Sequence, residues 1–449
     1  AEWPQWFMFD AFREIQHDHC HGDVIFWPLK SICEYIEATS DFALLDAKIP
    51  WTQRKGFAVT KDTSTLFEHI VRQVERIRQM FIGKTALVCY GDGDWDDTLQ
   101  PADSRLRSRM ASGWTVELCY QVLTRFAEIC RRGGKAEFAD QLTELAGRVL
   151  KDFNAHVVRG GIVSGFVIVE DDGGIRPLLH PDDKVTGIQY RLLPMTRGII
   201  SGIFTPDQAK KHLELIEKHL LFPDGARLMS RAAVYHDGLS KLFKRAETSA
   251  YFGREVSLQY VHAHIRYCEA LAKVGRGREL LRALLAVNPV ALQETVPTAV
   301  ARQSNTYFSS SDGDFADRYE AFARYDEIRQ GKVPVKGGWR IYSSGPGIYL
   351  KQVVAAFLGI RQSFGNVVLD PVMDASLDGL VVAMTFRGRA VKFRYHVKNR
   401  GFGPTKVEVS GKGLSIQREA NPYREGGAMI AADVFDAHVP AGATVDITV

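Results

Sequence analysis

The sequence predicts a mainly α-helical protein, an (α/α)6 helical toroid followed by a small C-terminal β-sandwich. Amphipathic helical patterns dominate the chain up to about residue 364, and short runs rich in Val, Ile, Thr and Phe, separated by Gly and Asn turns, follow it. Many helices of similar length joined by varied loops favour a toroid of helical hairpins. We therefore expect one domain over residues 1–364 and a second over residues 365–449.

The helices are predicted from residue spacing. Apolar residues recur at steps of three and four from Leu66 to Phe81, which lines one face of a helix within residues 64–82. Thr205-Pro206-Asp207-Gln208 offers an N-cap residue, a first-turn proline and the Gln of a capping box, so another helix is expected to start there. Further helices are expected over residues 115–130, 137–152, 257–271 and 277–286. Loops rich in Gly, Asp and Pro, such as residues 170–187 and 308–316, are expected to shape a site.

The β-strands are predicted only after the helices end. Each predicted strand is a short run of β-branched and aromatic residues bounded by turn residues. These runs are Leu380 to Phe386, Ala390 to Val397, Thr405 to Val409, Met429 to Phe435 and Thr444 to Val449.

Composition excludes several classes of protein. The 449 residues are 45% hydrophobic, 10% aromatic and 24% charged, as expected for a folded soluble chain. The net charge of +4 makes no basic stripe, which argues against nucleic acid. No apolar run is long enough to cross a bilayer, and six cysteines without CxxC spacing fit a reducing cytoplasm. The chain opens in mid-pattern at Ala1, so we expect N-terminal domains of a longer protein to be absent.

Residues 90–97, Tyr-Gly-Asp-Gly-Asp-Trp-Asp-Asp, place four carboxylates around one tryptophan. Asp92, Asp94 and Asp96 imitate the first ligands of a calcium loop, but Asp97 stands where that loop needs Gly, which argues against calcium. Another interpretation is a sugar site, in which the tryptophan is an apolar platform and one protonated Asp donates to a leaving oxygen. A solvated turn whose acids cap a helix is the remaining alternative.

Residues 93–97, Gly-Asp-Trp-Asp-Asp, resemble the Gly-Asp-Trp-Asn-Asp signature of the inverting phosphorylases of glycoside hydrolase family 94. This family includes the cellobiose and chitobiose phosphorylases and their β-1,2-glucan relatives. The resemblance implies that Asp97 is the general acid. Asp96 stands where the family commonly has Asn, and its charge would raise the pKa of the acid or require a partner of its own.

Two later segments extend the resemblance. Tyr260-Val261-His262 resembles the family's Phe-x-His, which implies that His262 contacts phosphate. Residues 339–347 resemble its Trp-x-Thr-Gly-Thr-Ala loop, which implies that Ser344 and Gly345 hold phosphate through a hydroxyl and a backbone amide. From the residues alone, His262 is also explained as a structural histidine, and the Ser-Gly segment as a turn that enters a helix.

The sugar-binding residues are also implied by the resemblance. Asp23 matches the last acid of the family's Arg-Asp…Gln-Asp segment, but no Arg occupies the earlier position, so Arg13, Lys30 and Arg191 are the candidate cations for phosphate. For Gln189-Tyr190-Arg191 a buried tyrosine beside a loop arginine is the alternative. The implied substrate-binding residues are Asp23, Trp95, Gln189, Tyr190, Arg191 and Glu255.

The N-terminal segment narrows the resemblance and raises one other possibility. Residues 4–10 and 21–30 look like the barrel entrance of the 1,2-β-oligoglucan phosphorylases. His17, Asp18, His19, Cys20, His21 and Asp23 also invite a metal interpretation, but residues this close cannot all face one ion without a tight loop. We therefore expect no metal.

The implied activity is inverting phosphorolysis of β-1,2-gluco-oligosaccharides to α-glucose 1-phosphate and a shortened chain. Phosphate is already a nucleophile, so the reaction needs one acid and no second carboxylate to activate water. Phosphate is then the co-substrate, β-glucan oligosaccharide the other partner, and no cofactor is expected; a homodimer is left open. The rival hypotheses are an inverting β-glucan hydrolase and a non-catalytic glucan-binding module of a cyclic β-1,2-glucan synthase-like protein.

Overall fold

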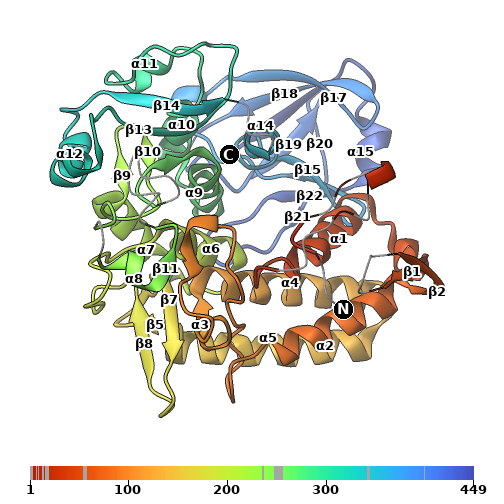
Figure 1. Ribbon diagram of the computed structural model, residues 1–449. Helices are drawn as coiled ribbons and strands as arrows, with labels where there is room; N and C mark the ends of the chain where they lie inside the picture. Colours follow the sequence, from red (N-terminus) through yellow and green to blue (C-terminus); the bar gives the residue numbers. More distant parts are fainter. Residues whose placement is uncertain are drawn as a thin grey trace.

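The computed structural model describes residues 4–6, 8, 10–12, 15, 20–53, 58–234, 237–246, 256–340, 344–398 and 400–449. A helical part occupies most of this length, and a β-rich part lies beside it at the C-terminal end of the chain (Figure 1). In the described ranges, no helix is both long and apolar enough to cross a membrane.

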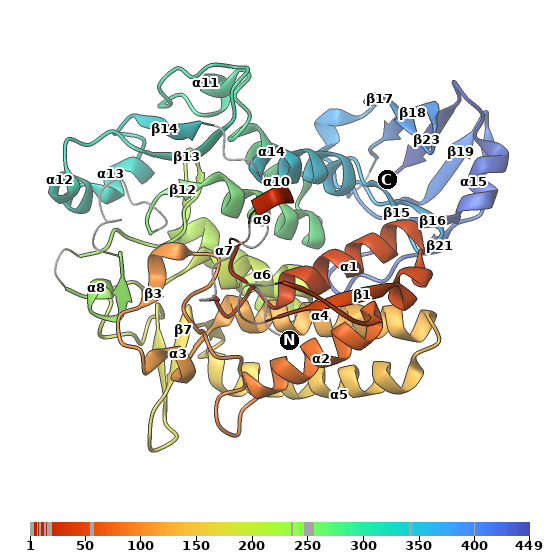
Figure 2. The same cartoon turned by 45° about the vertical axis from the view of Figure 1, so that its right-hand side comes forward.

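A row of helices forms the centre of the helical part. Neighbours pack in the order α1, α4, α6, α9 and α14, although other elements separate them in sequence (Figure 2). α4 is buried on nearly every side because α1, α5 and α6 all pack against it. The bounds are α1 Phe26–Thr39, α4 Gly113–Arg132, α6 Leu192–Ser201, α9 Val261–Val274 and α14 Ser344–Lys351, which continues into the π-helical η6 Gln352–Phe357.

A second set of helices covers this row from outside. α5 packs on α4, α7 on α6 and α10 on α9. α2 joins them through an edge-to-face contact of Phe67 with Phe138 on α5, whose ring centroids are 5.3 Å apart. The predicted capping box at Thr205 is confirmed, since its side chain accepts from Gln208 N and Gln208 accepts from Thr205 N. The bounds are α2 Leu66–Gln79, α5 Ala136–Asp152, α7 Pro206–His219 and α10 Gly277–Leu285.

The connections between helices contain more strand than the sequence predicts. Residues 308–316, expected to be a loop, contain β13 (Phe308–Gly313), which is the middle strand of an antiparallel sheet with β12 (Gln259–Tyr260) and β14 (Val335–Arg340). The 170–187 connection likewise contains an edge strand, β8 (Ile175–Leu178), which pairs with β7 (Phe166–Val169). The prediction for β13 failed because its serines have little intrinsic strand preference and the strand is stabilised by pairing on both edges.

The remaining short elements of the helical part complete these connections. The helical turns are η1 Asp10–Phe12, η2 Phe42–Asp46, η3 Asp97–Leu99, α3 Leu106–Arg109, η4 Phe153–Val157, α8 Leu239–Leu242, α11 Leu292–Thr295, α12 Arg318–Ala323 and α13 Tyr325–Arg329. The strands are β1 Lys48–Thr52, β2 Val59–Thr65, β3 Gln100–Pro101, β4 Met110–Ser112, β5 Val158–Arg159, β6 Ile162–Val163, β7 Phe166–Val169, β8 Ile175–Leu178, β9 Leu221–Phe222, β10 Gly225–Ala226 and β11 Phe243–Lys244.

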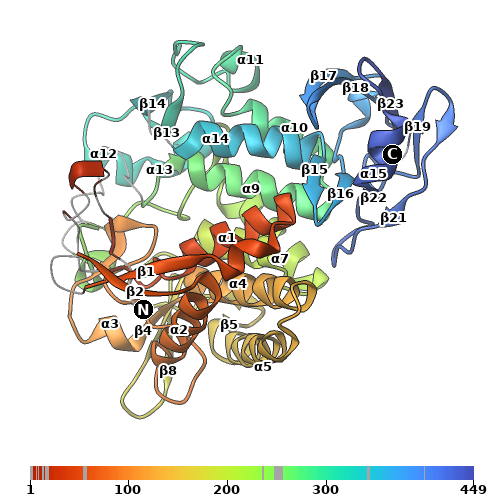
Figure 3. The ribbon, with the colours of Figure 1, turned by 90° about the vertical axis from the view of Figure 1, so that its right-hand side faces the viewer.

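The C-terminal part contains two sheets, in the strand orders β15-β16-β22-β21 and β17-β18-β23-β19-β20 (Figure 3). In β18, Val391, Phe393 and Tyr395 are buried and the residues between them face outward, which is the period of two that a half-buried strand requires. The bounds are β15 Ile360–Ser363, β16 Asn366–Leu369, η7 Ala375–Leu377, β17 Val381–Phe386, β18 Arg389–His396, β19 Lys406–Val409, β20 Lys412–Gly413, β21 Gln417–Arg418, β22 Ala428–Ala431, α15 Ala432–His438 and β23 Thr444–Thr448.

One predicted strand is partly wrong. The run Met429 to Phe435 starts as β22 but becomes α15 after Ala431. The helix turns Phe435 into the core, where its ring lies edge-on to Phe386 at 5.8 Å. The other predicted strands agree with β17, β18, β19 and β23 to within a residue or two.

The two parts share a continuous buried core. The backbone amide of Phe364 donates to the carbonyl of Glu37 at the end of α1, at 2.7 Å, and the Tyr423 hydroxyl donates to the carbonyl of Phe204 at 3.0 Å. The β-rich part is therefore fixed against the C-terminal ends of the central helices, and it leaves their N-terminal ends to other segments.

Candidate functional site

The sequence-predicted residues lie at the N-terminal ends of the central helices. These ends carry backbone N–H groups without partners in the helix and the positive end of the helix dipole, so they favour anions and oxygen-rich ligands. Asp23 lies in the turn before α1, Arg191 is the N-cap residue of α6, Tyr260 is the N-cap residue of α9, His262 is in the first turn of α9 and Ser344 begins α14.

The acidic segment divides into buried and open carboxylates. Asp94 is fully buried and accepts from the Ser112 hydroxyl at 2.7 Å, from the Asp96 backbone N at 2.9 Å and from Arg191 at 3.3–3.4 Å. Asp96 is also buried, and its Oδ2 lies 3.5 Å from Nη2 of Arg191. The two acids therefore anchor the loop to the N-terminal ends of α4 and α6.

Asp97 differs from its neighbours because its side chain is 51% exposed. It begins the 3₁₀ turn η3, and its backbone carbonyl accepts from Arg245 at 3.2 Å, which fixes the turn. Its Oδ1 lies 3.6 Å from Nδ1 of His21. The residue that the resemblance implies as general acid is thus one whose carboxyl group an incoming ligand can reach.

Trp95 joins this segment to α9. Its indole ring lies edge-on to Tyr260 at 5.1 Å and to His262 at 5.0 Å between ring centroids. The structure therefore brings together Trp95 and His262, which are 167 residues apart in the numbering of the chain.

His262 is a neutral imidazole in this environment. Burial, and after it the positive charges of Arg266 and Arg197, lower its pKa to about 3. The family resemblance implies a phosphate contact for His262, for which an imidazolium would be the stronger donor. Burial of the ring, with Arg266 and Arg197 nearby, disfavours that charge, so His262 can offer a neutral N–H donor.

The β12-β13-β14 sheet links the start of α9 to the start of α14, the two helices that carry residues 262 and 344. β12 leads directly into α9 and pairs with β13, where Tyr260 lies opposite Ser310. β13 in turn pairs with β14, where Ser310 lies opposite Gly338, and α14 begins shortly after β14. Gly345 is buried in the first turn of α14, where a Cβ atom would overlap the Tyr307 hydroxyl.

Asp23 is 3% exposed and keeps one oxygen without a partner. Trp27 Nε1 donates to its Oδ2 at 2.8 Å, whereas its Oδ1 has no hydrogen bond within the described residues. Burial, then the charge of Asp94 and to a lesser degree that of Asp97, raise its pKa to about 7. Asp23 is thus protonated in part near neutral pH, and its Oδ1, unpartnered among the described residues, is open to a ligand hydroxyl.

The other implied sugar residues are less closely grouped. Tyr190 is buried and stacks on His219 with 4.4 Å between centroids, while Gln189 is exposed and lines a separate cavity of about 570 Å³ with His219 and Arg329. Glu255 lies outside the described residues, so its predicted role is not tested by the fold.

The candidate phosphate cations are placed differently from the predicted site. Arg191 is engaged with Asp94 and Asp96 and stacks over Phe166 at 4.4 Å. Lys30 pairs with Glu34, and Arg13 is outside the described residues. Neither described candidate is therefore an unengaged positive charge beside Asp97.

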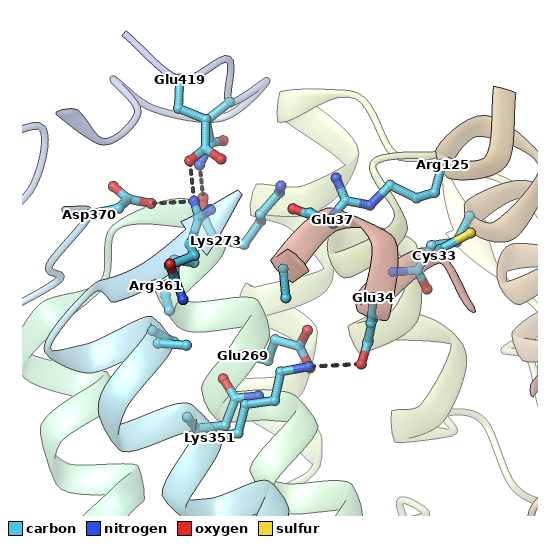
Figure 4. A pocket seen from close by; sticks show the side chains of 18 of the residues that line it. Cys33, Glu34, Glu37, Arg125, Glu269, Lys273, Lys351, Arg361, Asp370 and Glu419 are labelled. Carbon is cyan, nitrogen blue, oxygen red and sulfur yellow. Dashed lines mark hydrogen bonds and ion pairs between the residues drawn. The ribbon is translucent and has the colours of Figure 1, made fainter. Parts of the chain in front are cut away.

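Lys30 lines a second polar cavity, of about 430 Å³, between the C-terminal halves of α1, α4, α9 and α14 and the β-rich part (Figure 4). Most of its charges are paired with each other. In the described ranges no carboxylate lies within ion-pair distance of Lys273, whose pKa is lowered by burial and then by Arg125. The ion pairs in the wall of this cavity include Glu34 with Lys351 at 3.1 Å, Glu37 with Arg125 at 2.9 Å and Asp370 with Arg424 at 2.7 Å.

The sequence did not predict that His21 lies beside Asp97 or that Ser112 donates to Asp94. His21 is buried beside Asp97, and Gly93 makes room for it, because a Cβ atom at 93 would lie 3.1–3.2 Å from the imidazole ring. The glycine of the Gly-Asp-Trp motif was the available signal. Of the proposed metal segment, residues 17–19 lie outside the described chain, and the described part contains no group of three His, Cys, Asp or Glu side chains suited to a metal ion.

Comparison with known proteins gives two family matches. The description "Glycosyl hydrolase 94 superfamily, catalytic domain" matches residues 10–308, and "Glycoside phosphorylase C-terminal domain" matches residues 359–448.

Three curated relatives illustrate the similarity. The chain is 45% identical over 431 residues to a 1,2-beta-oligoglucan phosphorylase of Listeria innocua serovar 6a, covering 96% of this chain and 39% of that protein. It is 22% identical over 442 residues to an N,N′-diacetylchitobiose phosphorylase of Vibrio furnissii, covering 96% and 47%. It is 26% identical over 213 residues to a solabiose phosphorylase of Paenibacillus borealis, covering 47% and 26%. The chain thus spans less than half the length of each of these relatives.

Proposed function

Because the chain belongs to the glycosyl hydrolase 94 superfamily, we propose that it carries the catalytic site of an inverting phosphorylase of β-1,2-gluco-oligosaccharides. One structural observation supports this most strongly. Asp97 is half exposed in a segment whose two preceding acids, Asp94 and Asp96, are buried against Arg191, and the same segment reaches His262 through Trp95.

In this proposal Asp97 protonates the bridging oxygen of the terminal β-glucosidic bond. Phosphate attacks C1 from the opposite face, the C1–O bond breaks, and the shortened chain leaves as an alcohol with the proton of Asp97. A single in-line displacement inverts C1, so the product is α-glucose 1-phosphate. The proton that phosphate loses on forming the ester restores the acid.

The phosphate would be held mainly by neutral donors. His262 offers an imidazole N–H, Ser344 and Gly345 offer a hydroxyl and a backbone amide, and both segments stand in the first turns of α9 and α14. This arrangement compensates for the missing family arginine, since Arg191 is committed to Asp94 and Asp96. It resembles other phosphate sites that depend on backbone N–H groups more than on lysine or arginine.

The glucosyl ring would lie against Trp95, with Asp23 as a hydroxyl partner. A neutral carboxyl group can both donate to and accept from sugar hydroxyls, and the unpartnered Oδ1 of Asp23 is available for this. Tyr190, Gln189, Arg191 and Glu255 keep the substrate roles that the resemblance implies as part of the proposal, with Arg191 acting through Asp94.

We further infer that the central helices close into an (α/α)6 barrel and that residues 1–364 and 365–449 are the two domains, the second a β-sandwich. The ion pair of Glu34 with Lys351 supports closure, because it links α1 to α14, the two ends of the row. The relatives' greater length supports further domains in the natural protein.

The test is phosphate-dependent release of sugar phosphate from sophoro-oligosaccharides. We expect α-glucose 1-phosphate with phosphate present, no turnover without phosphate, and no α-glucose 1-phosphate from Asp97→Asn. Equal turnover without phosphate, giving free glucose, would instead indicate the hydrolase. Glucan binding with no turnover in the full-length protein would indicate a binding module.

A further inference from the structure

We propose that His21 is a positioning residue for Asp97, holding its carboxyl group toward the bridging oxygen and stabilising the carboxylate that forms when the proton leaves. This inference rests on the proposed function, in which Asp97 is the general acid. Nothing in the family resemblance assigned a role to His21.

The imidazole of His21 faces the carboxyl group of Asp97 directly. Nδ1 of His21 lies 3.6 Å from Oδ1 of Asp97, and in the part of the chain that the structure describes no lysine or arginine side chain lies within ion-pair distance of that carboxyl group. The imidazole is 8% exposed whereas the carboxyl is 51% exposed, so a fixed ring faces an open acid. Hydrogen bonds at catalytic groups are often long before substrate binds and shorten in the complex.

The backbone around His21 is tied to the loop that carries the acid. His21 forms a β-bridge with Gly91, and the Gly22 amide is shared between the carbonyls of Tyr90 at 3.1 Å and Gly93 at 2.9 Å. Gly22 has no room for a side chain, because a Cβ atom there would lie 2.6 Å from the carbonyl oxygen of Cys89. The distance between the imidazole and the acid is therefore set by main-chain contacts.

The ring orientation is fixed as well. The imidazole lies against Gly93, where a Cβ atom would come within 3.1–3.2 Å of three ring atoms, and the His21 amide donates to Gln5 at 2.8 Å. Asp23 is close enough to Asp97 for the charge of Asp97 to contribute to the raised pKa of Asp23, and Arg245 contacts only the backbone carbonyl of Asp97 among the described contacts. An Nδ1–H donor is the group that can stabilise the carboxylate when Asp97 ionises.

Leaving-group chemistry separates this role from a structural one. Phosphorolysis of a β-1,2-gluco-oligosaccharide needs the acid, whereas β-glucosyl fluoride releases a weak base and needs little proton donation. In the full-length protein we expect His21→Phe, which keeps a flat ring but loses the nitrogen, to lower kcat on sophorotriose by about 10²-fold and kcat on the fluoride by less than about 3-fold. His21→Asn, whose amide nitrogen sits near the Nδ1 position, should recover most of the lost rate.

The outcomes are distinct. A similar loss on both substrates, or no loss on either, would overturn the proposal. If His21→Phe does not fold, His21→Gln, which moves the nitrogen away from the Nδ1 position, is compared with His21→Asn and must show the same selective loss. Failure of the proposed function is recognised separately, since the wild-type protein would then give no α-glucose 1-phosphate from sophorotriose.

Discussion

Arg191 at the start of α6 grips Asp94 with both terminal nitrogens, at 3.3–3.4 Å, although the two residues are 97 positions apart. The pair is fully buried and includes Asp96 at 3.5 Å. Asp94 and Asp96 of the Gly-Asp-Trp-Asp-Asp segment therefore anchor the loop through Arg191, whereas Asp97 is half exposed. The buried arginine offsets the charges of the two buried acids, which allows several carboxylates to lie in one turn.

Arg191→Met should destabilise the protein by about 3–5 kcal/mol, because it leaves Asp94 and Asp96 buried without a counter-charge. Urea unfolding of the variant measures this. Arg125→Met is the matched control, since Arg125 is half exposed in its pair with Glu37 and should cost no more than about 1 kcal/mol. Equal effects of the two changes would contradict the anchoring role.

Asp97→Asn should lower kcat for phosphorolysis by about 10²–10⁴-fold while the melting temperature stays within about 2 °C, because the side chain is half exposed and its contact with His21, at 3.6 Å, is longer than a hydrogen bond. Asp94→Asn, in contrast, should lower the melting temperature, because it weakens the ion pair with Arg191. Activity assays and thermal unfolding of both variants measure the two effects. An Asp97→Asn variant that unfolds early would show that the two roles are assigned wrongly.

The imidazole of His262 should stay neutral throughout the physiological range. Its pKa of about 3 in the folded protein means that protonation is disfavoured by the buried site and by Arg266 and Arg197. Nitrogen-15 NMR of labelled histidine should therefore show a neutral ring at pH 6 without phosphate, and an imidazolium signal at that pH would contradict this prediction.

His262→Ala should raise the KM for phosphate by about 10- to 100-fold and leave the fold intact.

Glu117 should make the protein less stable as the pH rises. It is buried in α4 without a hydrogen bond from any described residue, and burial raises its pKa well above the usual value, despite the nearby Arg197 and Arg191. The folded state then binds more protons than the unfolded state once the pH exceeds the ordinary glutamate pKa of about 4.5, so stability falls with rising pH.

Glu117→Gln should remove this pH-dependent loss of stability, because glutamine does not ionise. It should raise the melting temperature by a few degrees at pH 8 and make no difference near pH 4, as measured by unfolding across that range. Glu128→Gln, at a surface pair with Arg132, is the control and should be neutral at both pH values. An unchanged pH slope in Glu117→Gln would mean that Glu117 is ionised in the fold.

The sequence anticipated the elements whose signals are local. The helix that starts after Thr205 was predictable because its capping box and first-turn proline are contiguous in sequence. The strand β13 was not, because Ser309, Ser310 and Ser311 carry no strand preference and depend on partners found about fifty positions before and thirty after them. The α15 segment has a strand-like composition but forms a helix, which places Phe435 in the core against Phe386.

The site could be anticipated in part for the same reason. Asp97, Trp95 and His262 were found through motifs, and the ring contacts place the last two together. That Arg191 would be committed to Asp94, and that His21 would face Asp97, depended on contacts between distant segments that no local pattern encodes. The charge state of His262 likewise depends on Arg197, which comes from a different helix.

The most direct test of the central claim is proton NMR of the anomeric product formed from sophorotriose and phosphate by the full-length protein. The account predicts that the first signal to grow is the α-anomer of glucose 1-phosphate, at a rate that depends on phosphate and vanishes in Asp97→Asn. A first-formed β-anomer of the sugar phosphate, or free glucose released at the same rate without phosphate, would contradict it.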